Sequence, residues 1–487
     1  MIFDYSRYGK LIESCNIIKV TIQLQYDILR MEKCVMQQRE HLASRLGFIL
    51  LSAGCAIGIG NVWKFPYMVG QYGGGAFVLI YIFFLIVMGV PVMTMEFALG
   101  RASQKSPVKL FNELEPKGSK WHIYGVGALA GNVILMMFYT TVCGWMLQYF
   151  VNTAKGDFVG LDSSGVAAEF DNMLADPVAL IIYMAIVVVV GFWVNSIGLQ
   201  KGLEKVTKVM MIALLVIMVI LAINSAFLPG GGEGLKFYLI PDLDRMKEAG
   251  IANVIVGAMN QSFFTLSLGI GSMAIFGSYL GKERTLMGES VNIAILDTFV
   301  ALTSGLIIFP ACFAYNVQPD SGPSLIFITL PNIFNNIPNG RLWGSLFFIF
   351  MSFAAFSTVL AVFENIIACT MDLTGWTRKK TCVIDGILMF ILSLPCALGY
   401  NVWSAFQPLG KGSAVLDLED FIVSNLLLPI GSLIFILFCV TRYGWGWDNF
   451  IAEANEGKGL RVAKWMRGYM TFVLPAIVVV IFVLGLL

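Results

Sequence analysis

The sequence predicts an all-α polytopic membrane protein, and three observations support this fold class. Of the 487 residues, 57% are hydrophobic and 13% are charged, whereas soluble domains are roughly a quarter charged. Mean hydropathy is +0.78. The apolar residues form continuous runs such as 181–190, not the short alternating segments of a membrane β-barrel. An ordinary soluble enzyme is therefore excluded, and no nucleic-acid partner is expected because the net charge is only +1.

Eleven apolar segments have the roughly 20 residues that a helix needs to cross a bilayer. When the connecting loops are assigned alternately to the two sides, most of the 32 Lys and Arg residues fall on one side. The positive-inside rule places that side, and the N-terminus, in the cytoplasm. We therefore expect a multi-pass protein of the cell (plasma or inner) membrane. Its predicted spans are about 46–70, 75–99, 123–151, 177–195, 205–227, 251–279, 290–315, 342–371, 382–400, 421–440 and 466–487.

Residues 1–35 lack the early apolar core and the small-residue cleavage site of a signal peptide. Two interpretations stay open. The segment is either an N-terminal extension or an artefact of start-site choice, with Met36 as the true first residue. The membrane domain is predicted to comprise residues 36–487, and composition gives no basis for assigning an oligomeric state.

Neither a transition-metal site nor an enzyme motif is predicted. The nine cysteines form no CxxC pair, and the two histidines lack metal-ligand spacing. The cysteines are interpreted as small buried hydrophobic residues. The sequence contains no Walker, HExxH or GxSxG motif. We therefore expect no enzymatic activity and no organic cofactor.

The segments 46–70 and 251–279 differ from the other predicted spans because glycine and small polar residues cluster in them. Residues 54–61 read GCAIGIGN, and residues 265–272 read TLSLGIGS. Glycine weakens a helix interior by about 1 kcal/mol relative to alanine, so both clusters predict local unwinding. Freed backbone groups at membrane depth must face protein, water or a ligand, and freed carbonyls suit a small hard cation. Close glycine packing between helices is the alternative, but two such clusters favour broken helices.

Three acidic residues, Glu96, Asp297 and Glu364, lie within apolar runs. Acids at membrane depth are costly and usually face the interior of a helix bundle. Glu96 is predicted to hydrogen-bond the unwound backbone, and Asp297 is predicted to be a cation ligand. The polar pair Ser357–Thr358 is a weaker signal, because such hydroxyls often bond back to their own helix.

Several motifs together resemble the bacterial amino-acid transporter branch of the neurotransmitter:sodium symporter family. The resemblance covers about 36–487, nearly the whole chain. It is carried by residues 39–47 (REHLASRLG), 54–66 (GCAIGIGNVWKFP), 73–77 (GGGAF), 89–91 (GVP) with Glu96, and 261–269 (QSFFTLSLG).

The resemblance implies a sodium-coupled symporter that imports a neutral apolar or aromatic amino acid by alternating access. It further implies inverted five-helix repeats at about 42–227 and 251–440, with the first helix of each repeat broken, and an extra helix at about 466–487. The alternative is a transporter-like amino-acid sensor with little translocation.

Two sodium ions are expected from the resemblance. The positions that match the first site are Ala56, Asn61, Thr265 and Asp297, and those that match the second are Gly54, Ile57, Ala354, Ser357 and Thr358. Chloride-dependent relatives carry a neutral Asn at the position of Asp297. A fixed carboxylate there supplies the negative charge itself, so transport is predicted to be independent of chloride.

The resemblance also implies a substrate pocket in which Tyr139 bonds the substrate carboxylate. Gly58 lies where monoamine transporters carry an Asp, so an amino acid is expected and not a bare amine. An apolar pocket separates substrates that differ by one methylene by only about 1–3 kcal/mol, so leucine, methionine, tyrosine and tryptophan all stay possible. The matching pocket positions are Ala56, Gly60, Leu135, Tyr139, Phe264, Thr265, Ser267, Ile270, Val359 and Val362.

Two gates complete the resemblance. Outside, the family pairs an Arg with an Asp, and the matching residues here are Lys64 and Asp420. Lysine cannot make the bidentate fork of arginine, so a looser outer gate is expected. Inside, Arg39 and Asp372 match the cytoplasmic pair, with Tyr279 nearby.

Overall fold

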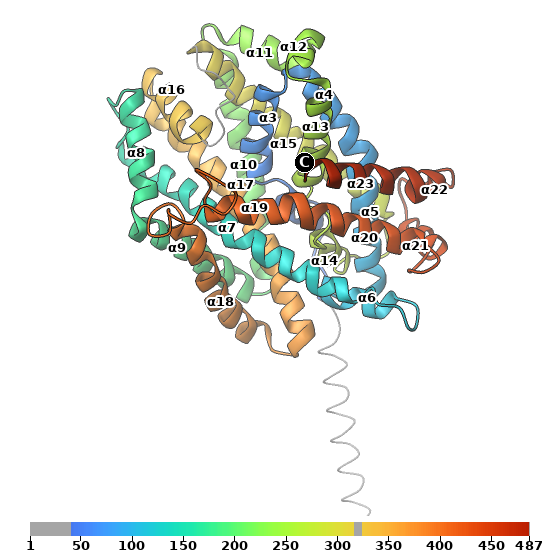
Figure 1. Ribbon diagram of the computed structural model, residues 1–487. Helices are drawn as coiled ribbons and strands as arrows, with labels where there is room; N and C mark the ends of the chain where they lie inside the picture. Colours follow the sequence, from blue (N-terminus) through green and yellow to red (C-terminus); the bar gives the residue numbers. More distant parts are fainter. Residues whose placement is uncertain (1–39, 316–323, 487) are drawn as a thin grey trace, which may run out of the picture. The chain divides into compact units, whose positions relative to one another are not determined.

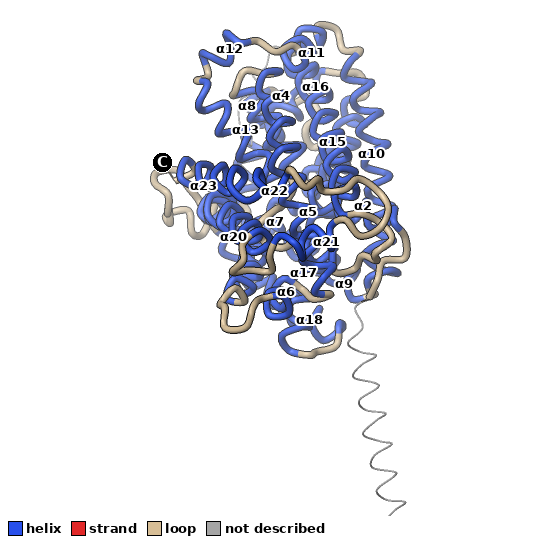
Figure 2. Tube along the Cα trace, turned by 90° about the vertical axis from the view of Figure 1, so that its right-hand side faces the viewer, coloured by secondary structure: helices blue, strands red, loops and turns tan. Residues whose placement is uncertain are grey.

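Helices joined by short loops make up the computed structural model, which describes residues 40–315 and 324–486 (Figure 1). Figure 2 draws no strand in these residues, and the β-type pairing described there consists of two isolated bridges, Gly74 with Pro241 and Arg284 with Lys458. The predicted all-α fold class is confirmed. Residues 1–35, and with them the question of the start site, lie outside the described part.

The helices follow one another along the chain, with π-helical segments labelled η. They are α2 (Arg45–Ala56), η1 (Gly60–Lys64), α3 (Phe65–Gln71), α4 (Gly75–Phe84), η2 (Leu85–Gly89), α5 (Val90–Ser103), α6 (Pro107–Leu114), α7 (Ile123–Lys155), α8 (Ser163–Ala175), α9 (Pro177–Ser196), η3 (Leu199–Glu204), α10 (Lys205–Ala226), α11 (Gly231–Leu239), α12 (Leu243–Glu248), α13 (Ile251–Thr265), α14 (Ser272–Gly277), α15 (Leu286–Ala314), η4 (Leu325–Thr329), α16 (Leu330–Asn336), α17 (Gly340–Thr374), α18 (Arg378–Leu398), α19 (Val415–Phe421), η5 (Ile422–Leu427), α20 (Leu428–Val440), α21 (Trp447–Ala454), α22 (Met466–Gly468), η6 (Tyr469–Val473) and α23 (Leu474–Leu484).

The predicted spans agree broadly with these helices. Within the described residues, nine continuous helical runs are long and apolar enough to cross a membrane. A tenth candidate is the pair Arg45–Ala56 and Gly60–Gln71, which is bent by 56° at its break. The remaining predicted span, 251–279, contains α13 and α14, which are separated by the irregular residues 266–271.

Prolines explain most of the π-helical segments. η1, η2, η4, η5 and η6 are each followed by an α-helix with a proline in its first two positions, for example Pro66 after η1 and Pro91 after η2. Proline has no N–H, and its ring clashes with the carbonyl four residues earlier. The preceding turn therefore widens, which is a common cause of kinks in long helices.

Long helices enclose the two breaks. α7 and α17 pack closely against each other, α14 packs on α5, and α15 packs on α2 and η1. In Figure 1 the cyan α7 and the orange α17 cross near the middle of the bundle. The cysteines of the described residues are buried, as their interpretation as small hydrophobic residues predicted. The breaks therefore lie in the interior, away from lipid.

Candidate functional site

The first break exposes backbone groups between α2 and η1. Its N–H groups have side-chain partners: the N–H of Gly58 donates to Asn61 Oδ1 at 3.2 Å, and the N–H of Ile59 donates to the Tyr139 hydroxyl at 2.9 Å. Among the described residues, the groups that approach the carbonyls of Gly54 and Ile57 at this break are hydroxyls, as set out below. The break thus presents oxygen atoms to its surroundings.

A buried carboxylate lies beside this break. Asp297 of α15 is fully buried. It accepts hydrogen bonds from the Asn61 amide at 2.8 Å, from the Thr265 hydroxyl at 3.1 Å and from the Tyr81 hydroxyl at 3.4 Å. No ion pair described in the structure includes Asp297. Because a buried carboxylate without a counter-charge is costly, this oxygen-rich cluster fits a small cation.

A second group of oxygen atoms joins α17 to the same break. The Thr358 hydroxyl lies 3.2 Å from the Gly54 carbonyl and 3.3 Å from the Ile57 carbonyl. The Ser357 hydroxyl bonds the Ala354 carbonyl at 2.9 Å and lies 3.5 Å from the Ile57 carbonyl. Carbonyl and hydroxyl oxygens are the ligands that hard cations prefer. The structure therefore brings together all five residues of the second predicted set.

A small inner cavity lies between the two broken helices. Its lining contains seven of the predicted pocket residues: Ala56, Gly60, Leu135, Tyr139, Phe264, Ser267 and Ile270. Cys55, Gly58 and Thr358 also line it, and so do Val423 and Leu428 from the tenth span. The last two were missed, because apolar residues within an apolar run carry no distinguishing pattern. Thr265, also a predicted pocket residue, faces Asp297 instead of the cavity lining.

Val359 and Val362 are predicted pocket residues that the structure does not bring to this cavity. Both are fully buried, but neither is among the lining residues. Val359 Cγ1 lies 3.5 Å from the position that a Cβ on Gly191 would occupy, so it faces α9. Thr358 faces the cavity, and the next residue of a helix points about 100° away from it. The rotation of α17 thus explains the placement of Val359.

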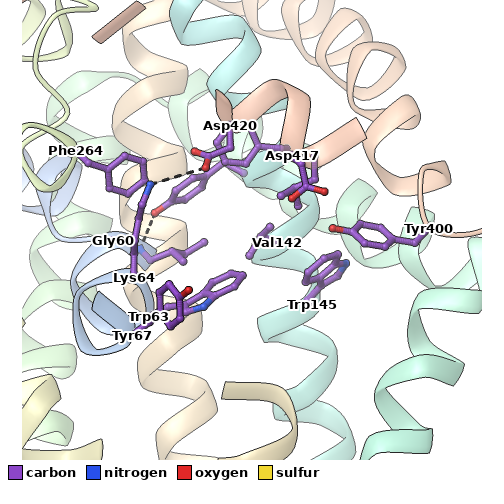
Figure 3. A pocket seen from close by; sticks show the side chains of 14 residues that line it. Gly60, Trp63, Lys64, Tyr67, Val142, Trp145, Phe264, Tyr400, Asp417 and Asp420 are labelled. Carbon is purple, nitrogen blue, oxygen red and sulfur yellow. Dashed lines mark hydrogen bonds and ion pairs between the residues drawn. The ribbon is translucent and has the colours of Figure 1, made fainter. Parts of the chain in front are cut away.

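Figure 3 shows a larger cavity, of about 360 Å³. It adjoins the inner one, and Gly60, Tyr139 and Phe264 line both. Aromatic side chains dominate its walls, among them Trp63, Tyr67, Trp145 and Tyr400, together with the carboxylates of Asp417 and Asp420.

The two residues of the predicted outer gate, Lys64 and Asp420, both line this larger cavity. Lys64 Nζ lies 3.8 Å from Asp420 Oδ2 and 3.8 Å from the centroid of the Phe264 ring, as Figure 3 shows. Both charged side chains are about one third exposed. The structure describes one contact between the two charged groups, at 3.8 Å, and the looser gate expected from a lysine stays a prediction.

The second break, residues 266–271, is held by side chains of neighbouring helices. Glu96 Oε1 accepts from the Gly269 N–H at 2.6 Å, and Oε2 accepts from the Met273 N–H at 3.2 Å. The Tyr124 hydroxyl donates to the Gly269 carbonyl at 2.5 Å. The prediction that Glu96 bonds the unwound backbone is therefore confirmed. Gly269 has φ +99°, and a Cβ there would meet the Leu428 carbonyl oxygen, so glycine is required.

The structure describes only part of the predicted cytoplasmic gate, because Arg39 lies outside the described residues. Asp372 Oδ2 accepts a hydrogen bond from the Ser106 N–H at 2.8 Å. The predicted residue Tyr279 donates from its hydroxyl to Glu364 at 2.5 Å. Glu364 is also paired with both terminal nitrogens of Arg378, at 2.6 and 2.9 Å. Arg378 had not been predicted, because a basic residue in a loop next to a span resembles any interfacial residue.

Two broken helices, whose breaks meet beside a cavity and a buried carboxylate, define the fold as that of a secondary transporter. The model of the Sodium:neurotransmitter symporter family matches residues 39–159 and 166–487, and the chain belongs to that family. It is therefore a sodium-dependent multi-pass membrane transporter and not an enzyme.

Similar proteins come from several prokaryotes. The uncharacterised sodium-dependent transporter YhdH of Bacillus subtilis is 34% identical, over 90% of this chain and 96% of its own length. An uncharacterised sodium-dependent transporter of Haemophilus influenzae is 30% identical, over 92% and 99%. The crystal structure of MhsT in complex with L-phenylalanine matches with a TM-score of 0.82 and 35% identity, and covers 92% of this chain and all of that one.

Proposed function

We propose that the protein imports a neutral apolar or aromatic amino acid together with two sodium ions, independently of chloride and by alternating access across the cell membrane. The observation that carries this proposal is the unpaired carboxylate of Asp297, which contacts Asn61 and Thr265 beside the inner cavity. Sodium at this position balances the buried charge. The second ion is assigned to the oxygen cluster around Thr358, where α17 meets the first break.

The shape of the inner cavity supports an amino acid as the substrate. A Cβ on Gly58 would lie 2.2 Å from the Tyr139 hydroxyl and 2.7 Å from Thr358 Oγ1. An acidic side chain that could bind a bare amine therefore has no room at position 58. The substrate carboxylate is assigned to the Tyr139 hydroxyl and the first sodium ion. Leu135, Ile270, Val423 and Leu428 give the cavity apolar walls, which suit an apolar or aromatic side chain, and the related MhsT was crystallised with L-phenylalanine.

Sodium binding can drive uphill import because each ion carries one charge. An elementary charge that crosses the membrane potential gains about 2.3 kcal/mol per 100 mV. In the proposed cycle, the two ions hold α15 and α17 to the first break and favour the state that is open to the outside. The substrate then closes the Lys64–Asp420 contact. The N-terminus is assigned to the cytoplasm.

Uptake of a labelled amino-acid panel into proteoliposomes tests the proposal. An inward sodium gradient should give accumulation of at least one apolar or aromatic amino acid, and Thr358→Val should raise the sodium concentration for half-maximal uptake. Thr303→Val is the matched control, because the bond that the structure describes for the Thr303 hydroxyl stays within its own helix, at the Phe299 carbonyl. Sodium-dependent binding without accumulation would instead indicate an amino-acid sensor. No sodium-dependent uptake or binding of any neutral amino acid would refute the proposal.

A further inference from the structure

The side chain of Ile270 forms part of the inner cavity and is seated against α7. Gly131, Leu135 and Tyr139 are spaced by four residues, so they lie on one face of α7, and the last two line the cavity together with Ile270. A Cβ on Gly131 would lie 2.6 Å from Ile270 Cγ2. Ile270 therefore occupies the notch left by the missing side chain at position 131, and the depth of this notch decides how far Ile270 projects into the cavity.

Asn132, which follows Gly131 in α7, holds the backbone of Ile270. The Asn132 amide nitrogen donates to the Ile270 carbonyl at 2.8 Å and to the Ala128 carbonyl of its own helix at 2.7 Å. Its oxygen accepts from the Ser272 hydroxyl at 3.2 Å and from the Asn365 amide at 3.0 Å. Asn132 is fully buried, and both of its donors and both of its acceptor positions are used.

These contacts connect residues 270–272 to α7, through Asn132, and to α17, through Asn365. Ile270 and Ser272 flank Gly271, which has φ +74° and is the last irregular residue before α14. Asn365 connects the same amide to α17. Glu96 and Tyr124 bond this segment at Gly269 and Met273, which do not line the inner cavity. Ile270 does line it, and its carbonyl is bonded by Asn132.

We propose that Asn132 is a positioning residue for substrate selectivity, which sets the largest side chain that the cavity accepts by fixing Ile270 in the notch at Gly131. The inference rests on the proposed function of the inner cavity. Removing the Asn132 side chain frees the Ile270 carbonyl and opens space beside its backbone. Ile270 then withdraws from the cavity, and substrates with larger side chains bind more tightly. A methyl group at Gly131 has the opposite effect, because it pushes Ile270 into the cavity.

Asn195 provides a matched control for the loss of a buried amide. Its nitrogen donates to the Gly191 carbonyl of its own helix at 3.0 Å and to the Leu360 carbonyl of α17 at 3.2 Å. It is fully buried and does not line the inner cavity. Asn195→Ala therefore measures the general effect of removing such an amide, without moving Ile270.

The experiment measures uptake of labelled leucine into proteoliposomes and its competition by unlabelled tryptophan. The readout is the half-inhibitory concentration of tryptophan divided by the KM for leucine. Asn132→Ala should lower this ratio at least fivefold, Gly131→Ala should raise it at least fivefold, and Asn195→Ala should leave it within twofold of wild type. Half-saturation by sodium should stay within twofold in all three variants.

The outcomes separate this inference from the proposed function. Wild-type protein without sodium-dependent uptake or binding contradicts the proposed function itself. Active wild-type protein with an unchanged ratio in both Asn132→Ala and Gly131→Ala overturns the role of Asn132. The role of Asn132 is also overturned if both variants raise the KM for leucine and the half-inhibitory concentration of tryptophan by the same factor. If Asn132→Ala does not elute as a single species in detergent, Asn132→Ser is measured in its place. A rise of the ratio in Gly131→Ala then supports the inference, and an unchanged or lowered ratio overturns it.

Discussion

The two broken helices of this transporter differ in the partners of their unwound residues. At the first break, between α2 and η1, the N–H groups of Gly58 and Ile59 bond Asn61 and Tyr139, while the carbonyl oxygens of Gly54 and Ile57 face the hydroxyls of Ser357 and Thr358. Hydroxyl oxygens are themselves cation ligands, so an ion can share these carbonyls with them. The first break is therefore suited to binding cations.

At the second break, between α13 and α14, side chains bond both N–H and carbonyl groups of the backbone. Glu96 accepts from the N–H of Gly269 and from that of Met273 in the first turn of α14, and Tyr124 and Asn132 donate to the carbonyls of Gly269 and Ile270. Bonds to a carboxylate are among the stronger hydrogen bonds in proteins. The difference teaches that unwinding serves two purposes here. We propose that the first break supplies ligands to sodium and that the second gives a fixed shape to a cavity wall.

The largest expected effect concerns the charge beside the first break. Asp297→Ala removes the carboxylate that balances a cation, so sodium-dependent uptake should fall more than 100-fold, and the thermal stabilisation by sodium should disappear. Asp385→Asn, which changes another buried acid in α18, is the control and should keep the sodium response. Sodium-dependent uptake that persists in Asp297→Ala would show that the first break does not need this charge.

The next effect concerns the stability of the second break. Glu96→Gln offers an NH2 group where a backbone N–H now points, so at least one of the bonds to Gly269 and Met273 is lost. An unsatisfied buried group costs about 1–3 kcal/mol, and thermal unfolding in detergent should report a loss of that size. Half-saturation by sodium should stay within twofold. Glu233→Gln, at an exposed pair with Lys236, should change stability by less than about 0.5 kcal/mol.

A smaller effect is expected at the contact that connects the two breaks. Lys64 belongs to η1, directly after the first break, and its ammonium lies over the ring of Phe264, just before the second. An exposed ion pair and a cation–π contact each contribute up to about 1 kcal/mol. Lys64→Ala should therefore raise the KM for substrate about fivefold. The control, Lys411→Ala, changes an exposed lysine outside the cavity lining, and equal kinetics for both variants would argue against a gate.

The breaks themselves were predictable from the sequence because their cause is local. Glycine with small polar residues weakens a helix wherever it lies, and an acid inside an apolar run indicates an interior partner, as Glu96 and Asp297 demonstrate. The tertiary partners were not predictable in the same way. Val423 and Leu428 are indistinguishable from lipid-facing residues in the sequence, and the placement of Val359 depends on how far α17 is rotated about its axis.

The smallest expected effect, no change at all, tests where the negative charge at the first break originates. The Asp297 carboxylate contacts Asn61 and Thr265, and we propose that it supplies the negative charge that balances sodium there without a bound anion. Replacing chloride by gluconate should leave the rate of sodium-driven uptake within experimental error, whereas replacing sodium by choline should abolish it. Uptake that collapses in gluconate would show that Asp297 does not supply this charge alone. The first break would then depend on a diffusible anion as well as on its own carboxylate.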